Sequence, residues 1–214
     1  MHEAGIPSNI VIAIEREYGS GGRTIGKMLA KRLGINYYNK DLSRLASELS
    51  GINEALFIDA DEMLQNKLPL KANKPAYKGD IISPDKSDYT SAKNLFNFQA
   101  QVLKNLAESE SCIIIGRCAN YVLRDYENVV SVFVHAPMDF LIEQSEKIQS
   151  FRGKELEKFI IRTNKNRSAY YNYYSGKEWS DARAYDLCLN SKKLGFEKCA
   201  DEILEYIKVR YGNT

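Results

Sequence analysis

The feature that most constrains this chain is a short apolar strand, a glycine-rich loop and an amphipathic helix in direct succession over residues 9–34. Residues 9–14 form a β-branched run of the length of a buried strand, and apolar residues recur at helical spacing over 25–33. Between them stand Gly19, Ser20, Gly21, Gly22, Arg23 and Thr24. Glycines let a backbone approach a ligand closely, and a helix that begins after Gly22 directs free N–H groups and its positive dipole end at that ligand. The order predicts an anion-binding loop.

The loop follows the nucleotide-binding pattern G-x-x-x-x-G-K-[ST] incompletely. If Gly22 is aligned with the second glycine, Thr24 takes the hydroxyl position that ligates Mg²⁺. Arg23 then replaces the lysine, and Glu17 replaces the first glycine. Arginine keeps a permanent positive charge, but its planar fork cannot imitate a compact ammonium, so its contacts to the β- and γ-phosphates must differ. The alternative is a strand-to-helix turn that holds no ligand.

Charge is nearly balanced over the 214 residues, with 30 basic against 28 acidic side chains. No global field therefore indicates nucleic acid or a membrane surface as a partner. The length suits one α/β domain with a sizeable core better than two domains. No apolar run approaches about 18 residues, and no segment near the N-terminus resembles a signal peptide, so we expect a cytoplasmic protein.

The four cysteines show neither CxxC nor metal-binding spacing, and Cys112 and Cys188 lie in apolar runs that resemble core strands. We expect reduced, buried thiols. The two histidines are too far apart in the sequence for a zinc site, and His135, which follows VSVFV, is expected at the end of a strand.

Strands and helices alternate beyond the first helix. Further strands are expected at residues 35–38, 112–115, 129–134 and 185–189, and helices at 42–50, at 93–109, from about 138 and at 194–211. Asp41 is placed to cap the helix over 42–50. Such alternation predicts a parallel sheet with helices on both faces and ligands at the carboxyl ends of the strands.

Residues 51–93 depart from this alternation. After a possible helix at 53–64, the segment contains three prolines and many polar residues, with no periodic apolar face. We interpret it as a surface loop or mobile insertion, because a long loop inside a compact domain is usually either functional or disordered.

Residues 151–167 hold six basic residues against two acidic ones. On a helix, one basic stripe would contain Lys154, Lys158, Arg162 and Lys165. Arg167 instead falls on the apolar arc, at about 100° per residue. Either the helix breaks near residues 163–164, or this guanidinium points inward, where it needs an anionic partner. The alternative is an ordinary amphipathic helix with a solvated basic face.

Both outcomes at Arg167 suit a flap that closes arginines over phosphates, because phosphoryl transfer depends on positioning and on neutralising charge. Arg117 follows Gly116 at the carboxyl end of a central strand, which in a doubly wound sheet lies beside the glycine loop. It faces either bulk water or a substrate anion, and we favour the anion.

Taken together, the motifs resemble the cytidylate kinase-like proteins, relatives of bacterial cytidylate kinase among the P-loop nucleoside monophosphate kinases. They are IEREYGSGGRTIG, CIIIGRCANYVL, FVHAP, the segment with Arg162, Lys165 and Arg167, and YDLCLNSKKLGFEKCADEIL. The resemblance covers about residues 9–210 and is weakest across 51–93. It implies an α/β P-loop NTPase fold, a parallel five-stranded sheet flanked by helices. We expect a single domain over 1–214, with its core at 9–50 and 93–214, a mobile insertion at about 51–93 and a helical lid at about 151–175.

The resemblance also implies roles for individual residues. Gly19 to Thr24 would hold the phosphates of ATP, Arg117 would contact the phosphate of the acceptor nucleotide, and Lys40 and Asp41 would border the monophosphate site. Arg162 and Arg167 would be catalytic lid arginines, and Lys165 belongs to the same lid segment. The chain departs from the family at Arg23, at Ile115, where the third strand ends without a carboxylate, and in the lid, where it has Thr163, Asn164 and Asn166 in place of aspartates.

We therefore expect an ATP- and Mg²⁺-dependent phosphotransferase that acts on a nucleoside monophosphate, with CMP or dCMP as the leading acceptor. Arg23, Arg162 and Arg167 are the expected catalytic residues, and Thr24 the metal ligand. One alternative is a nucleotide-binding regulatory protein with weak turnover, suggested by Arg23 and the missing carboxylate. Another is an RNA-binding module built on residues 154–167 and the tyrosine tract 170–174. Small nucleotides are the expected partners, with no specific nucleic acid and no membrane, and the oligomeric state is left open.

Overall fold

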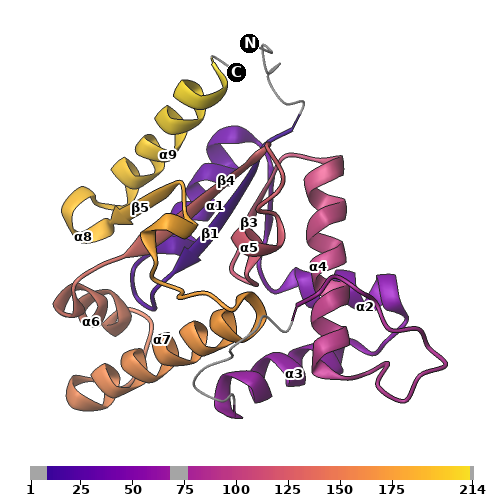
Figure 1. Cartoon of the computed structure of the whole chain (residues 1–214). Helices are drawn as coiled ribbons and strands as arrows, with labels where there is room; N and C mark the ends of the chain where they lie inside the picture. Colours follow the sequence, from indigo (N-terminus) through magenta and orange to yellow (C-terminus); the bar gives the residue numbers. More distant parts are fainter. Residues whose placement is uncertain (1–8, 68–76, 213–214) are drawn as a thin grey trace.

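The computed structural model describes residues 9–67 and 77–212 and places one sheet between two layers of helices (Figure 1). The strand order is β2-β3-β1-β4-β5, and all neighbouring strands are parallel. The strands are β1 (Val11–Arg16), β2 (Asn36–Tyr38), β3 (Cys112–Ile115), β4 (Val129–His135) and β5 (Leu187–Asn190). The predicted parallel five-stranded α/β fold is confirmed.

The helices connect these strands and cover both faces of the sheet. In chain order they are α1 (Gly22–Leu33), α2 (Asp41–Ser50), α3 (Glu54–Lys67), α4 (Ala92–Ser109), α5 (Ala119–Val122), α6 (Met138–Glu146), α7 (Gly153–Ser175), the 3-10 turn η1 (Ala182–Ala184), α8 (Ser191–Leu194) and α9 (Phe196–Tyr211). The carboxyl ends of the strands point toward the bottom of Figure 1, where α6 and α7 lie.

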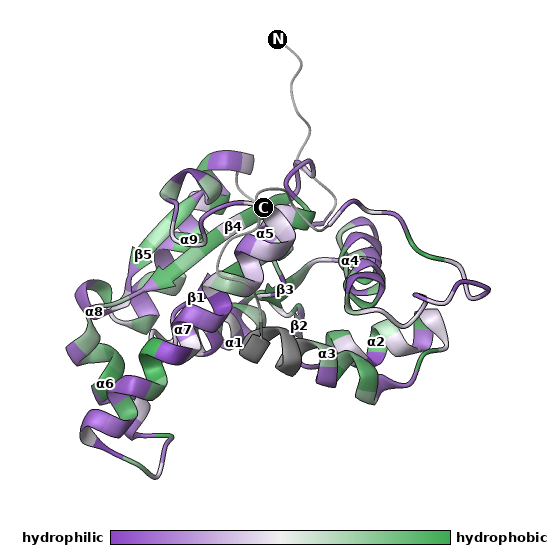
Figure 2. Cartoon of the chain, turned by 60° about the horizontal axis from the view of Figure 1, so that its bottom comes forward, coloured by the Kyte–Doolittle hydropathy of each residue, from purple (hydrophilic) through white to green (hydrophobic). Residues whose placement is uncertain are grey.

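Side chains of β1 alternate between the two layers because successive residues of a strand point to opposite faces. Ile12 and Ile14 pack in one cluster with Ile25 of α1 and Ile203 of α9. Val11 and Ala13 belong to the other cluster, which α4, α5 and the tyrosines of α7 complete. The central strands are accordingly hydrophobic over most of their length, whereas the helices carry hydrophilic outer surfaces (Figure 2).

Helix α7 is continuous from Gly153 to Ser175, so the chain does not break at residues 163–164. Its C-terminal half is anchored in the core, where Tyr170, Tyr171 and Tyr174 are buried and Tyr174 stacks on Phe96 of α4 at 3.6 Å between ring centroids. Its N-terminal half packs on α6 in a small separate cluster. The tyrosine tract is a packing surface.

Two element boundaries differ from the sequence prediction at sites near the glycine loop. Strand β1 runs two residues beyond the predicted end at Ile14, because Glu15 and Arg16 pair with Phe133 and Val134 of β4. Asp41 does not cap α2. It is the first residue of the helix, Lys40 holds the cap position, and no side chain makes a cap hydrogen bond there.

Two further predictions are corrected near the C-terminus. The helix expected over 194–211 is divided into α8 and α9 by Gly195, whose φ of 78° and ψ of 163° are incompatible with a helix. Cys188 is exposed, while the other three cysteines are buried, and all four are free thiols. Its strand lies at the edge of the sheet, and its neighbours Leu187 and Leu189 take the face that packs on α9.

The described parts of the segment over residues 51–93 pack against the core. It contains α3, and the backbone amide of Tyr77 donates to the carbonyl oxygen of Tyr174 in α7 at 3.3 Å. The side chain of Asn94 bonds both backbone groups of Ile82, as acceptor at 2.7 Å and donor at 3.1 Å. Residues 68–76 lie outside the described part of the chain. Over residues 9–67 and 77–212, no helix combines the length and apolar character that crossing a membrane requires.

Candidate active site

The glycine loop leaves β1 at Glu17 and enters α1 at Gly22, along a course that side chains would obstruct. Gly19 and Gly21 both have φ of 83°. A Cβ atom on Gly21 would lie 2.2 Å from the ring of Phe196, and one on Gly19 would lie 2.5 Å from the carbonyl oxygen of Leu141. The glycines are therefore required by close packing against α6 and α9 as well as by backbone conformation.

The loop is held from within and from two sides. Ser20 is fully buried, and its hydroxyl donates to the carbonyl oxygen of Glu17 at 2.9 Å. Glu17, in place of the first glycine of the pattern, accepts a hydrogen bond from the Ala136 amide beyond β4 at 3.1 Å. The amide of Tyr18 donates to the Asn164 side chain of α7 at 2.7 Å. The loop is thus preorganised.

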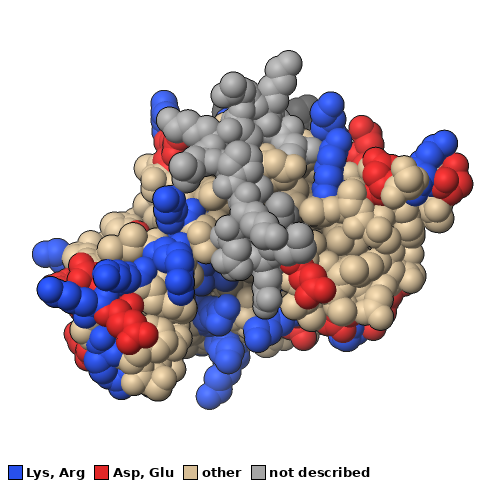
Figure 3. Space-filling model, turned by 90° about the horizontal axis from the view of Figure 1, so that it is seen from below, with Lys and Arg blue, Asp and Glu red and all other residues tan. Residues whose placement is uncertain are grey.

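Two cavities open at the carboxyl edge of the sheet, one on each side of the loop. The first, of about 410 Å³, is the loop cavity, which is lined by Gly19, Gly21, Gly22 and Thr24 together with residues of α6 and Phe196. The second, of about 500 Å³, is the strand-end cavity, which is lined by Glu15, Lys40, Arg117, Thr163 and Tyr171 among others. Arg16, Arg23 and Arg167 line both. Figure 3, seen from this edge, shows basic side chains along the middle of the face.

Arg16 is the most constrained of the three arginines. Its side chain fits where two glycines lack a Cβ, since a Cβ on Gly22 would lie 2.6 Å from Arg16 Cβ and one on Gly116 would lie 2.3 Å from Arg16 Nη1. Glu15 lies 3.8 Å from Nη1, and the buried Nε atom has no hydrogen-bond partner within the described chain. Burial, together with the charges of Arg23 and Arg117, lowers the pKa of Arg16 to about 10 against the opposing effect of Glu15.

Arg167 points inward from α7, which is the second of the two outcomes that the sequence left open. Its Nη1 donates to the carbonyl oxygen of Arg16 at 2.9 Å, and its guanidinium lies 5.6 Å from the centroid of the Tyr18 ring. Burial holds the pKa of Arg167 well below its ordinary value, and the charges of Arg16 and Arg23 act in the same direction. Such a cluster of cations favours an anion between the two cavities.

Glu15 supplies a buried carboxylate beside these arginines. It is 5% exposed, and its Oε2 accepts a hydrogen bond from the indole nitrogen of Trp179 at 3.0 Å. The third strand lacks a carboxylate at its end, as the sequence indicates, but β1 next to it places one in the same cavity. The same Oε2 atom lies 3.8 Å from Arg16 Nη1, so the Trp179 bond fixes the oxygen that faces this arginine.

Arg117 reaches the strand-end cavity from a strained turn after β3. Arg117 and Cys118 have φ of 62° and 54°, and they are the non-glycine residues with positive φ in the described chain. Such conformations cost on the order of 1–3 kcal/mol each and persist where the surrounding structure imposes them. The turn directs the Arg117 side chain toward the cavity, instead of continuing the strand.

Not all predicted site residues meet in the cavities. Lys40 lines the strand-end cavity, whereas Asp41 is exposed and does not line it. Arg162 and Lys165 are exposed and line neither cavity, and Arg162 lies 5.8 Å from the Phe159 ring. Five residues separate Arg162 from Arg167, which corresponds to roughly 140° around a helix, so one orientation of α7 cannot direct both inward.

The described residues contain no cluster of three or more metal-ligating acids, histidines or cysteines. Mg²⁺ in phosphotransfer sites is bound by one or two protein oxygens, substrate phosphates and water, so a dedicated cluster is not required. Thr24 lines the loop cavity and is exposed there, at the first turn of α1. Its hydroxyl fits the role of a single protein ligand.

Sequence reasoning missed Arg16, Glu15 and Trp179. The apolar run ends at Ile14, and charged residues after such a run resemble a loop. A signal was present in two glycines, Gly22 at the start of α1 and Gly116 directly after β3, because small residues around a strand end leave room for one large side chain. Trp179 could not be found, because 164 residues separate it from Glu15.

Comparison with known proteins gives one family and several relatives. Residues 11–193 match the model of the cytidylate kinase-like family. A protein from Staphylothermus marinus named cytidylate kinase is 22% identical over 204 residues, which cover 93% of this chain and 97% of that protein.

Among solved structures, an uncharacterized protein from Eubacterium ventriosum superposes with a TM-score of 0.66 at 26% identity, over 94% of this chain and 99% of that one. A shikimate kinase from Bacteroides thetaiotaomicron superposes with a TM-score of 0.52 at 16% identity, over 93% and 98% of the two chains. The second likeness shows a shared fold alone.

Proposed function

The chain belongs to the cytidylate kinase-like family, and from this and its site we propose that it transfers the γ-phosphoryl group of ATP to a nucleoside monophosphate. Membership makes it a kinase-like P-loop protein. CMP or dCMP is the acceptor that we place first, because a relative named cytidylate kinase aligns over almost the whole chain.

One observation carries the proposal. Arg16, Arg23 and Arg167 line both cavities, so they stand where a group passing from one cavity to the other would be. The transferred phosphoryl group spreads negative charge over its oxygens, and catalysis of its transfer consists mainly of positioning and of neutralising this charge. A buried Arg16 Nε without a partner in the described chain is available to such an oxygen.

The residues divide into those on the side of the phosphoryl donor, ATP, and those on the side of the phosphoryl acceptor, the monophosphate. ATP phosphates would lie on the amides of residues 19–24 with Arg23, at the N-terminus of α1. Mg²⁺, with Thr24 as its protein ligand, would offset charge on the phosphate oxygens. In the strand-end cavity, Arg117 and Lys40 would bind the acceptor phosphate, and Asp41 would stand at its border.

Arg16 and Arg167 would neutralise the group in transfer. No general base is assigned, because the acceptor phosphate is already an anionic nucleophile. We further propose that the exposed half of α7, with Arg162 and Lys165, closes over the bound nucleotides. The buried tyrosines in its other half would remain fixed and serve as the pivot.

A coupled assay of ADP release tests this function. Each common ribo- and deoxyribonucleoside monophosphate is offered with ATP and Mg²⁺, and we expect the highest kcat/KM with CMP or dCMP. Arg23→Ala is the matched negative control. ADP release that does not depend on any monophosphate would overturn the proposal.

The second candidate is a nucleotide-binding regulatory protein with weak turnover, which Arg23 in place of lysine favours. If the protein binds ATP but transfers a negligible amount of phosphoryl group to every acceptor, the regulatory protein is favoured over the kinase. An RNA-binding module is less consistent with the structure, because Tyr170, Tyr171 and Tyr174 are buried and form no exposed platform on which successive bases of a strand could stack.

A further inference from the structure

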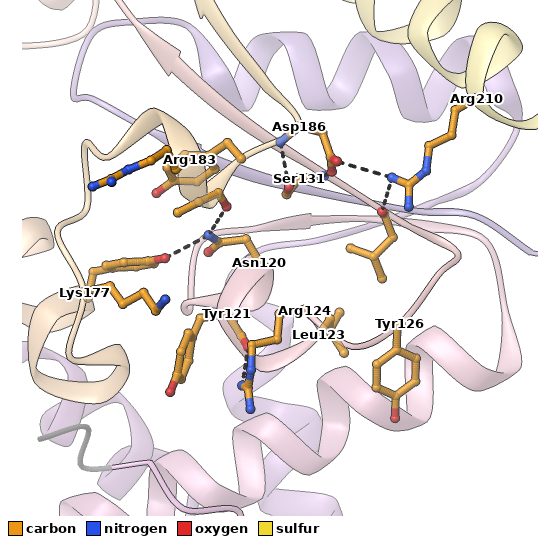
Figure 4. A pocket seen from close by; sticks show the side chains of 14 residues that line it. Asn120, Tyr121, Leu123, Arg124, Tyr126, Ser131, Lys177, Arg183, Asp186 and Arg210 are labelled. Carbon is orange, nitrogen blue, oxygen red and sulfur yellow. Dashed lines mark hydrogen bonds and ion pairs between the residues drawn. The ribbon is translucent and has the colours of Figure 1, made fainter.

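A third cavity lies between α5, η1 and the beginning of β4, away from the carboxyl edge of the sheet (Figure 4). Its volume is about 320 Å³, within the range of small-molecule sites. Four tyrosines line it, which are Tyr121, Tyr126, Tyr171 and Tyr185. We refer to it as the rear cavity. Nothing in the proposed phosphotransfer uses it.

The rear cavity contains an unsatisfied buried acceptor. Asn120 is 5% exposed, and its Nδ2 donates to the Tyr171 hydroxyl at 2.9 Å and to the carbonyl oxygen of Ala184 at 3.2 Å. The carbonyl of Ala184 can only accept, so this bond fixes which end of the amide is the nitrogen. Asn120 Oδ1 is left without a partner in the described chain. Buried polar atoms of this kind are costly unless a ligand or water completes them.

One end of the cavity is electrically neutral. There the carboxylate of Asp186 bonds Ser131, Tyr206 and Arg210, so the polar groups satisfy one another. A ligand at this end would have to displace contacts that are already made, and the neutral end therefore offers little to a charged group.

The other end is basic. Lys177 makes no ion pair within the described residues, and the ion pair of Arg124 is with the exposed Asp125 at 3.5 Å. The guanidinium of Arg124 also lies 4.5 Å from the centroid of the Tyr121 ring, which holds it at the cavity wall. Figure 4 shows Asn120 near the middle, with Lys177 and Arg124 on one side and the Asp186–Arg210 pair on the other.

We propose that the rear cavity is a second binding site for a nucleoside monophosphate, separate from the phosphotransfer site. Its base would donate a hydrogen bond to Asn120 Oδ1 and lie among tyrosine rings, which present flat apolar faces and polar edges. Its phosphate would lie at the basic end, near Lys177 and Arg124. A buried acceptor, a ring wall and a cationic end together specify a nucleotide more closely than a simple anion.

Occupancy of the rear cavity is transmitted to the active site through Tyr171. This tyrosine hydrogen-bonds Asn120 and lines both the rear and strand-end cavities. It lies four residues after Arg167 on α7, which places the two on one face of the helix. A ligand bound to Asn120 would therefore act on α7 one helical turn from Arg167. This coupling rests on the proposed function, whereas the binding itself does not.

Calorimetry with the active site blocked tests the binding. The full-length protein is saturated with a bisubstrate compound, adenosine and cytidine joined 5′ to 5′ through five phosphates, and then titrated with each nucleoside monophosphate. We expect one further binding event. Lys177→Glu should weaken it by about tenfold or more, the loss of about 1.4 kcal/mol, whereas the exposed Lys31→Glu in α1 should leave it unchanged. Ribose 5-phosphate, which lacks a base, should bind more weakly.

Asn120→Leu adds a second variant, which keeps the approximate size of the side chain and removes the Oδ1 acceptor. It should weaken the same event, and circular dichroism and thermal melting establish that it is folded. If neither Lys177→Glu nor Asn120→Leu changes the affinity of this event, or if no further binding is seen at all, the proposal is overturned. If the phosphotransfer proposal is wrong, the bisubstrate compound fails to bind, yet the Lys177-dependent event still appears in its absence. The two failures are therefore distinguishable.

Discussion

The guanidinium of Arg167 and the backbone carbonyl oxygen of Arg16 form a 2.9 Å hydrogen bond that joins α7 to the end of the central strand. Residues 151 positions apart in sequence thereby place two largely buried cations together. Because α7 begins on an exposed basic segment and ends in the core, this bond marks the boundary between its two halves. The Arg167 guanidinium is therefore positioned by its place on α7 and by its hydrogen bond to the backbone of β1.

Arg16→Ala should lower kcat/KM by about 10³-fold, the magnitude seen when a charge-neutralising arginine is removed from a phosphotransferase. Arg16→Lys should recover only part of it, because a point charge cannot replace the planar fork. Arg44→Ala, at an exposed arginine of α2, serves as the control. Steady-state assays with both substrates varied provide the measurement, and a rate within tenfold of wild type for folded Arg16→Ala removes this residue from the mechanism.

Gly116→Ala should impair catalysis because the added methyl group would meet Arg16 Nη1 at 2.3 Å and displace it. Gly51→Ala is a matched control, since Gly51 has a similar φ of 72° and open space around its Cβ position. Both should lose roughly 1–2 kcal/mol of stability to left-handed backbone strain. Denaturant unfolding and kcat/KM are measured together. Equal kinetic effects in the two variants would contradict the role given to Arg16.

Arg117→Ala should raise the KM for the acceptor monophosphate and change ATP affinity by only a few-fold, because Arg117 lines the strand-end cavity and not the loop cavity. Arg117→Gly should raise this KM equally but be more stable than Arg117→Ala, since glycine adopts a φ of 62° without strain. Initial rates and thermal melting separate the two effects. If either folded variant lost ATP binding, Arg117 would belong to the ATP site and not to the acceptor site.

Arg167→Ala should reduce kcat more than it raises either KM, because a cation that neutralises the group in transfer acts mainly on the transition state. Arg162→Ala should lower kcat less than Arg167→Ala, because Arg162 is exposed and reaches the nucleotides only when α7 closes. Lys158→Ala should do little, as exposed charges contribute about 0–1 kcal/mol. Amide exchange in residues 153–167 should slow when both nucleotides are bound, with no change over 170–175. The lid would be ruled out if amide exchange in this segment did not respond to nucleotides and if the three variants had the same kinetics.

Thr24→Ala should weaken binding of Mg²⁺-ATP more than binding of metal-free ATP, since the hydroxyl is the proposed inner-sphere ligand. Thr24→Ser keeps that oxygen and should retain most of the affinity. Calorimetric titrations in the presence of Mg²⁺ and of a chelator give the comparison. If Thr24→Ala loses equal affinity under both conditions, the metal ligand lies elsewhere.

Periodicity and glycine placement were sufficient to predict the sheet, the loop and the helix behind it, since these depend on local sequence. The inward direction of Arg167 also followed from helical geometry, given that α7 does not break. The contacts of Arg16 could not be predicted, because they depend on β1 pairing with β4 through residues that are themselves charged.

The rest of the site depends on contacts distant in sequence. The bond between Glu15 and Trp179 and the tie between Asn120 and Tyr171 join residues 164 and 51 positions apart. Cys188 shows the same dependence, since its exposure follows from the edge position of β5 and not from its apolar neighbours.

The hydrogen bond from Tyr77 to Tyr174 and the stack of Tyr174 on Phe96 limit how this protein can be recombined with its relatives. The hydroxyl of Tyr174 also donates to the carbonyl oxygen of Ala92 at 3.3 Å, across 82 positions of sequence. These contacts join the end of the 51–93 segment and the fixed half of α7 at one tyrosine. The segment contributes backbone groups to both hydrogen bonds, whereas the stack depends on the side chain of Phe96, which lies outside the segment. A graft that keeps the length of the segment can therefore keep these contacts, provided that Phe96 and Tyr174 are retained.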